Sequence, residues 1–437
     1  MDNNQKKYTL AFVLVMLCFA LWGFGGSVTN PMVKAFSKIF KMSVTDGTMV
    51  QLAWYGGYFA MALPAAIFVR RHSYRSGMLL GLSLMAIGSF CFWQASSLGS
   101  YYPFLLAYFV VTCGQSFLET AANPFMLTLG DKDKAAYRLN MAQSFNPIGC
   151  MLGMYAAMAM VQQRLSPLTA AEREALPVDE FEALKLSDLQ ILCSPYLLFG
   201  IAALLLAIGI WLIKLPTTTE NDGGNFPIIA TFRCIAKGHR FQLGFIAQFF
   251  HMGAQVMCWT FIIQYGTEVF TAQGMSEEAA EVLSQKYNIA AMVLFCLMRF
   301  VCTFLMKYVS PARLMAFMSV GAMACTAGVI LIGGQVGIYC LVGISGFMSL
   351  MFPTIYSLAL SDLDGEDAKI GAAGQVMAIL GGSLMPMLQA YIIDGNGACG
   401  LSPVNISFVV PLLCFAVVLA FSIIISISDK KRAQQHI

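Results

Sequence analysis

One carboxylate, Glu119, lies inside a long apolar run and is the residue of this sequence best placed to carry a proton. It is the only acidic residue in the interior of any segment long enough to cross a membrane. Twelve residues separate it from the polar loop at Asp131, about 18 Å at a helical rise of roughly 1.5 Å per residue. That depth is near the middle of a hydrocarbon core about 30 Å thick, where a carboxylate costs at least about 2.5 kcal/mol. Glu119 must therefore face the protein interior or a water-filled cavity, which makes it a candidate for reversible protonation.

Amide side chains recur within the apolar segments. Asn30, Asn123 and Asn146 each precede a proline, and Gln143 lies three residues before Asn146, on the same helical face. Such amides either hydrogen-bond neighbouring helices or present donors and acceptors to a polar solute, and we favour a solute for Gln143 and Asn146. The glycine-rich stretch before Asn30 could let a ligand approach the backbone, but close helix packing explains it equally well.

A stripe of four polar or aromatic residues lies at helical spacing in the second half of the chain. Gln248, His251, Gln255 and Trp259 are separated by three, four and four residues, which places them along one side of a helix. A packed interface of satisfied side chains would give the same pattern. Two amides and an indole suit a sugar better, because amides bond hydroxyl groups and an aromatic plate covers a pyranose face. His251 by itself is as readily a structural hydrogen-bonding residue.

Further candidates are isolated. Trp54, Tyr356 and Gln375 are polar or aromatic residues within apolar segments and are candidate sugar contacts. Arg299 lies eight residues before Lys307, about 12 Å from the end of its segment. It could pair across a gate, but a structural pairing or a side chain that reaches toward the interface is the favoured interpretation.

Composition sets the class of protein that positions these residues. With 58% hydrophobic residues, 11% charged residues and a mean hydropathy of +0.71, the chain has too little polar surface for a soluble globule. The 13 cysteines lie almost entirely in apolar segments, so they are expected to be core residues and not a disulfide framework. A net charge of +3, with scattered basic residues, gives no indication of nucleic-acid binding. We expect no metal and no cofactor.

Apolar windows of about 20 residues predict twelve membrane spans in an all-α protein. Their approximate limits are 9–36, 48–69, 76–95, 102–130, 138–162, 191–213, 241–268, 285–306, 313–333, 336–360, 370–393 and 404–427. The first span is expected to be retained, because its apolar run is too long for a signal peptide. Residues 163–190 could form short surface helices. A polar linker, 215–240, separates an N-terminal bundle, 1–214, from a C-terminal bundle, 241–437.

The basic residues predict the orientation of the spans. If the N-terminus is cytoplasmic, 18 of the 26 Lys and Arg residues lie inside and seven lie outside, with Arg299 within a span. This bias places both termini and the linker in the cytoplasm. Two six-span halves joined by a cytoplasmic linker are the layout of transporters in which one bundle rocks against the other.

Several motifs are similar to those of the fucose–proton symporter family of the major facilitator superfamily, over nearly the whole chain. They are L-E-T-A-A-N-P-F at 118–125, R-L-N-M-A-Q-S-F-N at 138–146, A-Q-F-F-H-M-G-A-Q-V-M-C-W at 247–259, F-M-S-L-M-F-P-T-I-Y-S-L at 347–358 and I-L-G-G at 379–382. The resemblance implies two six-helix bundles and import of a monosaccharide, L-fucose first, together with a proton. It also implies that Glu119 is the membrane-embedded acid that couples the two, with a bacterial inner membrane as the location and a monomer as the state.

The chain departs from this family at one position. The family usually carries a second acid in the first span, where alignment on Leu21 and Trp22 places Asn30, and an amide cannot carry a proton. Glu119 would then be the only proton carrier. Burial would disfavour its charged form until water enters its cavity. Transport of another hexose, sodium coupling or facilitated diffusion stays open, as does a receptor without transport. An intramembrane serine protease, with Ser345 in G-I-S-G and His251 as base, is a remote alternative.

Overall fold

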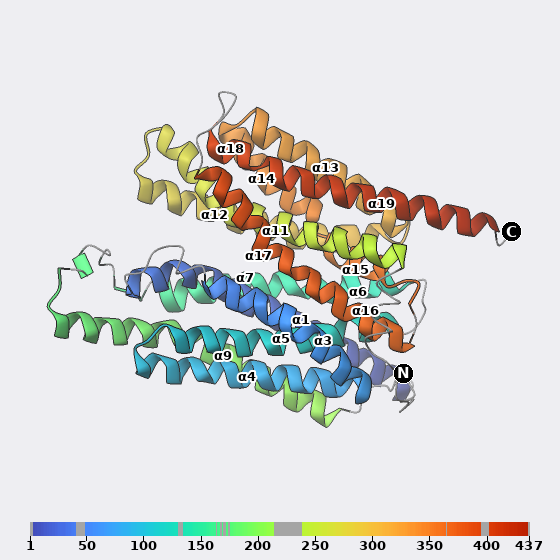
Figure 1. Ribbon diagram of the computed structural model, residues 1–437, viewed down its shortest axis with the longest axis horizontal. Coiled ribbons are helices and arrows are strands. Elements are labelled where there is room, and N and C mark those ends of the chain that lie inside the picture. The colour runs from blue at the N-terminus through green and yellow to red at the C-terminus, as the bar shows by residue number, and fades with distance from the viewer. Residues whose placement is uncertain are drawn as a thin grey trace. The chain divides into compact units, whose positions relative to one another are not determined.

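The structure is a computed structural model in which every described element is helical (Figure 1). The described residues are 3–40, 49–129, 134–162, 164–166, 168, 172–173, 175–213, 238–363, 365–394 and 402–435. Eleven helical segments among them are long and apolar enough to cross a membrane. A further long helix, α3 (Met49–Arg71), occupies the second predicted span. The predicted all-α membrane fold is therefore confirmed.

The chain divides into two compact units. Unit 1 comprises Met1–Leu129 and Phe145–Gly224, and unit 2 comprises Gly130–Ser144 and Asn225–Ile437. The predicted domain limits remain a prediction, and 215–237 of the expected linker lie outside the described residues. A feature that the hydropathy pattern did not indicate is that the first part of the fifth span groups with unit 2 and the rest with unit 1.

Unit 1 is assembled from long helices that approach one another through glycine. Its helices are α1 (Asn3–Phe40), α3, α4 (Tyr74–Leu98), α5 (Tyr102–Thr128), α7 (Phe145–Ala157), the π-helical turn η2 (Met158–Gln162) and α9 (Val178–Leu212). α4 lies along α5, where a Cβ on Gly81 would come within 2.7 Å of the Gly114 carbonyl oxygen. α7 lies along α1, where a Cβ on Gly149 would overlap the Ala20 carbonyl. Without side chains at these positions the backbones pack closely, as is usual between membrane helices.

Unit 2 is organised around α11 (His239–Ala272), which contacts most of its other helices. These are α6 (Ala135–Gln143), α12 (Glu277–Leu305), α13 (Pro311–Leu331), α14 (Gly334–Met348), α15 (Met351–Ala359), α16 (Gly365–Met377), the 3₁₀ turn η3 (Ala378–Leu380), α17 (Gly381–Ile393), α18 (Pro403–Ser407) and α19 (Val409–Gln435). Three predicted spans are thus interrupted helices: α14 with α15, α16 with α17, and α18 with α19. Among the candidate site residues, Tyr356 lies on α15, Gln375 on α16, and Gln143 and Asn146 on either side of the break between α6 and α7.

The segment between the fifth and sixth spans differs from its expected short surface helices. α9 begins at Val178 and continues without interruption into the sixth span, so its first three turns extend beyond the predicted start at 191. A buried ion pair, Arg173 to Asp188 at 2.5 Å, attaches part of the preceding segment to this extension. Asp188 also accepts a hydrogen bond from the backbone N–H of Ser166, so this one carboxylate binds two points of the preceding segment.

Candidate functional site

Glu119 lies about two-thirds of the way along α5 and is 2% exposed. Its Oε1 accepts a hydrogen bond of 3.5 Å from the Nδ2 of Asn123, one turn further along the helix. Its Oε2 has no hydrogen-bond partner among the described residues, and no cationic side chain in that part of the chain acts on it. A buried carboxyl with one open oxygen and no counter-ion is suited to the neutral, protonated form.

A hydrogen-bonded chain of three side chains, which the sequence analysis did not identify as a site, lies one turn before Glu119. The indole N–H of Trp22 on α1 donates to the hydroxyl of Tyr58 on α3, and that hydroxyl donates to the Oε1 of Gln115 on α5 at 2.9 Å. Gln115 is fully buried. The spacing of four residues between Gln115 and Glu119 was the available signal, because it places both on one helical stripe.

Two other candidates of unit 1, Asn146 and Trp54, make packing contacts within the unit. The Nδ2 of Asn146 donates to the backbone oxygen of Phe19 at 3.3 Å, and its Oδ1 accepts from the Cys150 thiol. Asn146 therefore joins α7 to α1. Trp54 is buried edge-on against the ring of Tyr108. Asn30 lies within α1, but its side chain lies outside the described residues.

The α11 stripe in unit 2 is buried at one end and partly open at the other. Gln248 and His251 are fully buried, whereas Gln255 and Trp259 are half-buried. Gln255 lies one helical turn from His251, whose two ring nitrogens have no hydrogen-bond partner among the described residues. The indole N–H of Trp259 donates to the Oγ of Ser345 at 3.3 Å, and the indole lies edge-on to Phe295 with ring centroids 5.0 Å apart. The structure thus holds the indole in a fixed orientation.

Two buried amides in unit 2 lack hydrogen bonds altogether among the described residues. Neither the nitrogen nor the oxygen of the Gln248 side chain has a partner there, and the same is true of Gln375 on α16. Gln375 lies beside α11, where a Cβ on Gly244 would be 3.6 Å from its Nε2. Tyr356 on α15 is fully buried and stacks with Phe352. A buried polar group without a partner costs about 1–3 kcal/mol, so these amides are well suited to a polar ligand.

Arg299 on α12 is 3% exposed and is held by backbone carbonyls. Its Nε donates to the oxygen of Ser349 at 2.6 Å, its Nη1 donates to the oxygen of Gln143 at 3.0 Å, and its guanidinium lies 4.7 Å from the centre of the Phe295 ring. Within unit 2 the side chain is therefore fixed by hydrogen bonds and does not extend to the surface.

The two carbonyls that Arg299 binds are those that proline leaves without a donor. In a continuous helix Gln143 would accept from residue 147 and Ser349 from residue 353, and both of those residues are proline. The helix is interrupted after each carbonyl, at Ser144 and at Ser349. The chain passes from unit 2 to unit 1 after Ser144, so Gln143 and Asn146 belong to different units.

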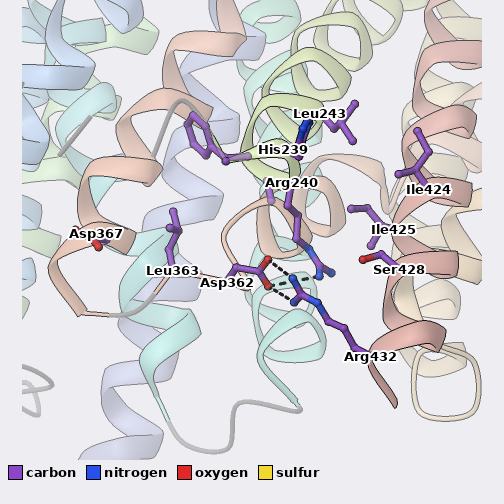
Figure 2. A pocket seen from close by; sticks show the side chains of 13 residues that line it. His239, Arg240, Leu243, Asp362, Leu363, Asp367, Ile424, Ile425, Ser428 and Arg432 are labelled. Atoms are coloured by element: carbon purple, nitrogen blue, oxygen red, sulfur yellow. Dashed lines mark hydrogen bonds and ion pairs between the residues drawn. The ribbon is translucent and has the colours of Figure 1, made fainter. Parts of the chain in front are cut away.

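A separate polar network lies where α11 begins, α15 ends and α19 ends (Figure 2). Asp362 pairs with Arg432 at 2.7 Å and with Arg240 at 3.5 Å, and Arg240 also bonds Asp429 and the backbone oxygen of Leu358. The hydrogen bond from Arg432, with help from Arg240, holds the pKa of Asp362 below its ordinary value. The adjoining cavity of about 370 Å³ is lined by balanced charges, so the network joins three helix ends and presents no net charge to a ligand.

Ser345, the serine of the G-I-S-G sequence, lacks the geometry of a nucleophile. Its Oγ accepts from the indole of Trp259 and makes no hydrogen bond to His251 among the described residues. A serine nucleophile needs a base within hydrogen-bonding reach. The protease alternative therefore has no support in this structure.

Comparison with known proteins agrees with the fold and with the resemblance. The model of the Major Facilitator Superfamily matches residues 15–386. An L-fucose-proton symporter of Haemophilus influenzae is 42% identical over 95% of this chain and 96% of its own. An L-fucose-proton symporter of Escherichia coli and a glucose/galactose transporter of Brucella abortus are each 30% identical, over 96% and 97% of this chain and 94% and 95% of their own.

Solved structures give the same result. The crystal structure of FucP, a Major Facilitator Superfamily transporter, in the outward conformation superposes with a TM-score of 0.83 and 30% identity, covering 96% of this chain and 99% of its own. The human organic anion transporter MFSD10 superposes with a TM-score of 0.66 at 13% identity, covering 96% and 100%, which shows similarity of fold alone.

Proposed function

Because the chain belongs to the Major Facilitator Superfamily, we propose that it imports a monosaccharide, L-fucose first, by proton symport through alternating access. It is a multi-pass integral membrane protein and not an enzyme. The 42% identity to a symporter named for L-fucose and protons supports both the sugar and the coupling ion. The bias of basic residues supports cytoplasmic termini, and the bacterial relatives support a bacterial inner membrane. We propose a monomer.

The observation that carries the proposal is the buried carboxyl of Glu119, on which no counter-ion acts among the described residues. An acid without a counter-ion in a membrane helix is expensive unless its protonation is used. Glu119 takes up a proton when water reaches it from outside, and the neutral acid then costs less to carry through a closed state. Water that enters from the cytoplasmic side restores the charged form and releases the proton. Asn123, which donates to Oε1, keeps the carboxyl in place through these steps.

Unit 2 contributes the polar groups for the sugar in this proposal. The unsatisfied amides of Gln248 and Gln375 would bond hydroxyl groups, and the fixed indole of Trp259 would cover an apolar face of the ring. His251 and Tyr356 are buried on the same helices or beside them and complete the set. Arg299 supports this group without contacting the sugar, because its hydrogen bonds go to backbone oxygens.

A second candidate is transport of another hexose, by sodium symport or by facilitated diffusion. The similarity to a glucose/galactose transporter favours the first part, and Asn30 in place of an acid favours the second. A panel of L-fucose, galactose, glucose, mannose and N-acetylglucosamine, each added to purified protein in a thermal-shift assay, would identify the ligand because it stabilises the folded state. If uptake follows a sodium gradient at constant pH, the coupling ion is sodium and not the proton.

The coupling itself is tested by reconstituting wild-type protein and Glu119→Gln in proteoliposomes. The glutamine resembles the protonated acid, so the variant should exchange labelled sugar by counter-flow but show no sugar-driven proton uptake. Proton uptake equal to that of the wild type would exclude Glu119 as the carrier. Counter-flow that is missing from the wild type as well would contradict transport of the chosen sugar and leave a receptor as the alternative.

A further inference from the structure

Gln115 is a buried amide for which the proposed transport cycle has no role. Gln115, Glu119 and Asn123 follow one another at intervals of four residues and form one stripe along α5. All three are at most 2% exposed. The acid is therefore flanked by one amide on each side. Asn123 already donates to Oε1, which leaves Oε2 and Gln115 to be explained.

The orientation of the Gln115 amide is fixed by the two residues behind it. An indole N–H can only donate, so the oxygen of Tyr58 is the acceptor of the bond from Trp22. The Tyr58 proton then goes to the Oε1 of Gln115, at 2.9 Å. Oε1 is thereby occupied, and Nε2 becomes the end that faces away from the chain of hydrogen bonds. Nε2 has no partner among the described residues.

The Nε2 of Gln115 is thus a donor without an acceptor among the described residues. One helical turn further along α5, the Oε2 of Glu119 is an acceptor without a donor. A neutral carboxyl does not require such a donor, whereas a carboxylate gains strongly from one. The helices packed against α5 offer little else: α3 brings the hydroxyl of Tyr58 near the acid, whereas Gly77 and Gly81 of α4 face Ala121 and Leu118 of α5. No lysine, arginine or histidine of the described chain acts on the carboxyl.

We propose that Gln115 is a positioning residue for the proton carrier, whose Nε2 donates to Oε2 of Glu119 when the acid is deprotonated and is released when it is protonated. Nε2 lies against Gly25 of α1, where a Cβ would come within 2.8 Å of the amide nitrogen, so the amide keeps its place only because that residue has no side chain. Trp22 and Tyr58 act through Gln115 by occupying Oε1, which leaves Nε2 as the end available to the acid. The inference rests on the proposed function, since it concerns the deprotonated half of that cycle.

The test measures labelled L-fucose binding by the full-length protein in lipid nanodiscs as a function of pH. Binding that requires protonated Glu119 is lost as the pH rises, at a midpoint that the donor from Gln115 lowers. Gln115→Met keeps the length of the side chain and removes the donor, so its midpoint should lie about one pH unit higher. Tyr58→Phe releases the amide without removing it and should shift the midpoint in the same direction by less. Gln389→Met, which removes a buried amide bonded to Ser407 in unit 2, should leave it unchanged.

The outcomes separate this inference from the function on which it rests. A Gln115→Met protein that binds sugar with the wild-type midpoint, or with a lower one, overturns the inference. If Gln115→Met does not fold, an unchanged midpoint in Tyr58→Phe overturns it instead. A wild-type protein whose binding is independent of pH, or a Glu119→Gln protein that keeps the wild-type pH dependence, contradicts the proposed function and not the role of Gln115 alone.

Discussion

Arg299 and Pro147 act on the same atom, the backbone oxygen of Gln143: the proline withholds the helical donor and the arginine supplies one at 3.0 Å. The same relationship joins Arg299 and Pro353 at the oxygen of Ser349, at 2.6 Å. One guanidinium thus satisfies two interrupted helices. An arginine in an apolar segment, which the sequence alone leaves without a partner, is explained by two prolines on other helices.

Arg299→Met should therefore destabilise the protein strongly, because two buried carbonyls lose a charged donor at about 1–3 kcal/mol each. We expect the apparent melting temperature in detergent to fall by about 5 °C or more, with a matching loss of sugar counter-flow. Arg313→Met, at an exposed arginine of the next helix, is the control and should melt like the wild type. Adding Pro147→Ala to Arg299→Met restores one backbone donor and should recover part of the lost stability. If no stability is recovered, Arg299 does not act by replacing the missing donor to Gln143.

The unsatisfied amides of unit 2 predict that removing one of them raises the stability of the sugar-free protein and weakens sugar binding. Gln375→Met removes a buried amide with no hydrogen bond among the described residues, so the sugar-free protein should become more stable by about 1 kcal/mol. Sugar binding should fall at least about tenfold if the amide bonds a hydroxyl group. Thermal melting with and without sugar measures both effects. Gln389→Met, which breaks a 2.9 Å bond to Ser407, should instead lower stability. Loss of stability in Gln375→Met would indicate a structural amide.

The Asp362 network predicts a pH dependence of stability. Its hydrogen bond from Arg432 lowers the pKa of Asp362 in the folded protein, so the stabilisation is complete above the ordinary carboxyl pKa of about 3.9 and is lost as the pH falls below it. Since about a third of the side chain is exposed, the effect should be at most about 1 kcal/mol. Asp362→Asn should melt slightly below the wild type at pH 7 in low salt, and this difference should shrink as the pH falls below the ordinary carboxyl pKa. A constant difference across that range would disprove the ionic contribution.

The close approach of α1 and α7 predicts a sharp contrast between two glycines. A Cβ at Gly149 would overlap the carbonyl of Ala20, which belongs to the backbone and cannot move aside. Gly149→Ala should therefore destabilise by about 1–3 kcal/mol and reduce the folded yield. At Gly209 the nearest atom is a leucine methyl group at 3.6 Å, an ordinary contact, so Gly209→Ala should be tolerated. Size-exclusion profiles and melting temperatures of the two variants measure this contrast. Equal melting temperatures would argue against tight packing at Gly149.

The sequence was sufficient for the fold class because hydropathy depends on local composition. Span limits agree within a few residues where a helix is continuous, as in α5 and α13. The start of α9 was missed because its first turns are charged and carry no membrane signal, although they are helical. The break at Ser144 was missed since Pro147 alone does not reveal whether its helix bends or stops.

The site was predictable to the extent that helical spacing defines it. Glu119 and the α11 stripe could be selected because depth and periodicity are visible in one segment. The chain from Trp22 through Tyr58 to Gln115 could not, because it joins three helices whose pairing is a tertiary property. For the same reason, the separate anchorage of Gln143 and Asn146 could be found only from coordinates.

The interruption at Ser144 has a mechanical consequence. On one side the chain is tied to α12 through the carbonyl of Gln143, and on the other it is tied to α1 through the amide of Asn146, with only two residues between the ties. Ser144 is itself hydrogen-bonded to the carbonyl oxygen of Asn140 through both its backbone N–H and its hydroxyl group, so three fixed points lie within residues 143–146.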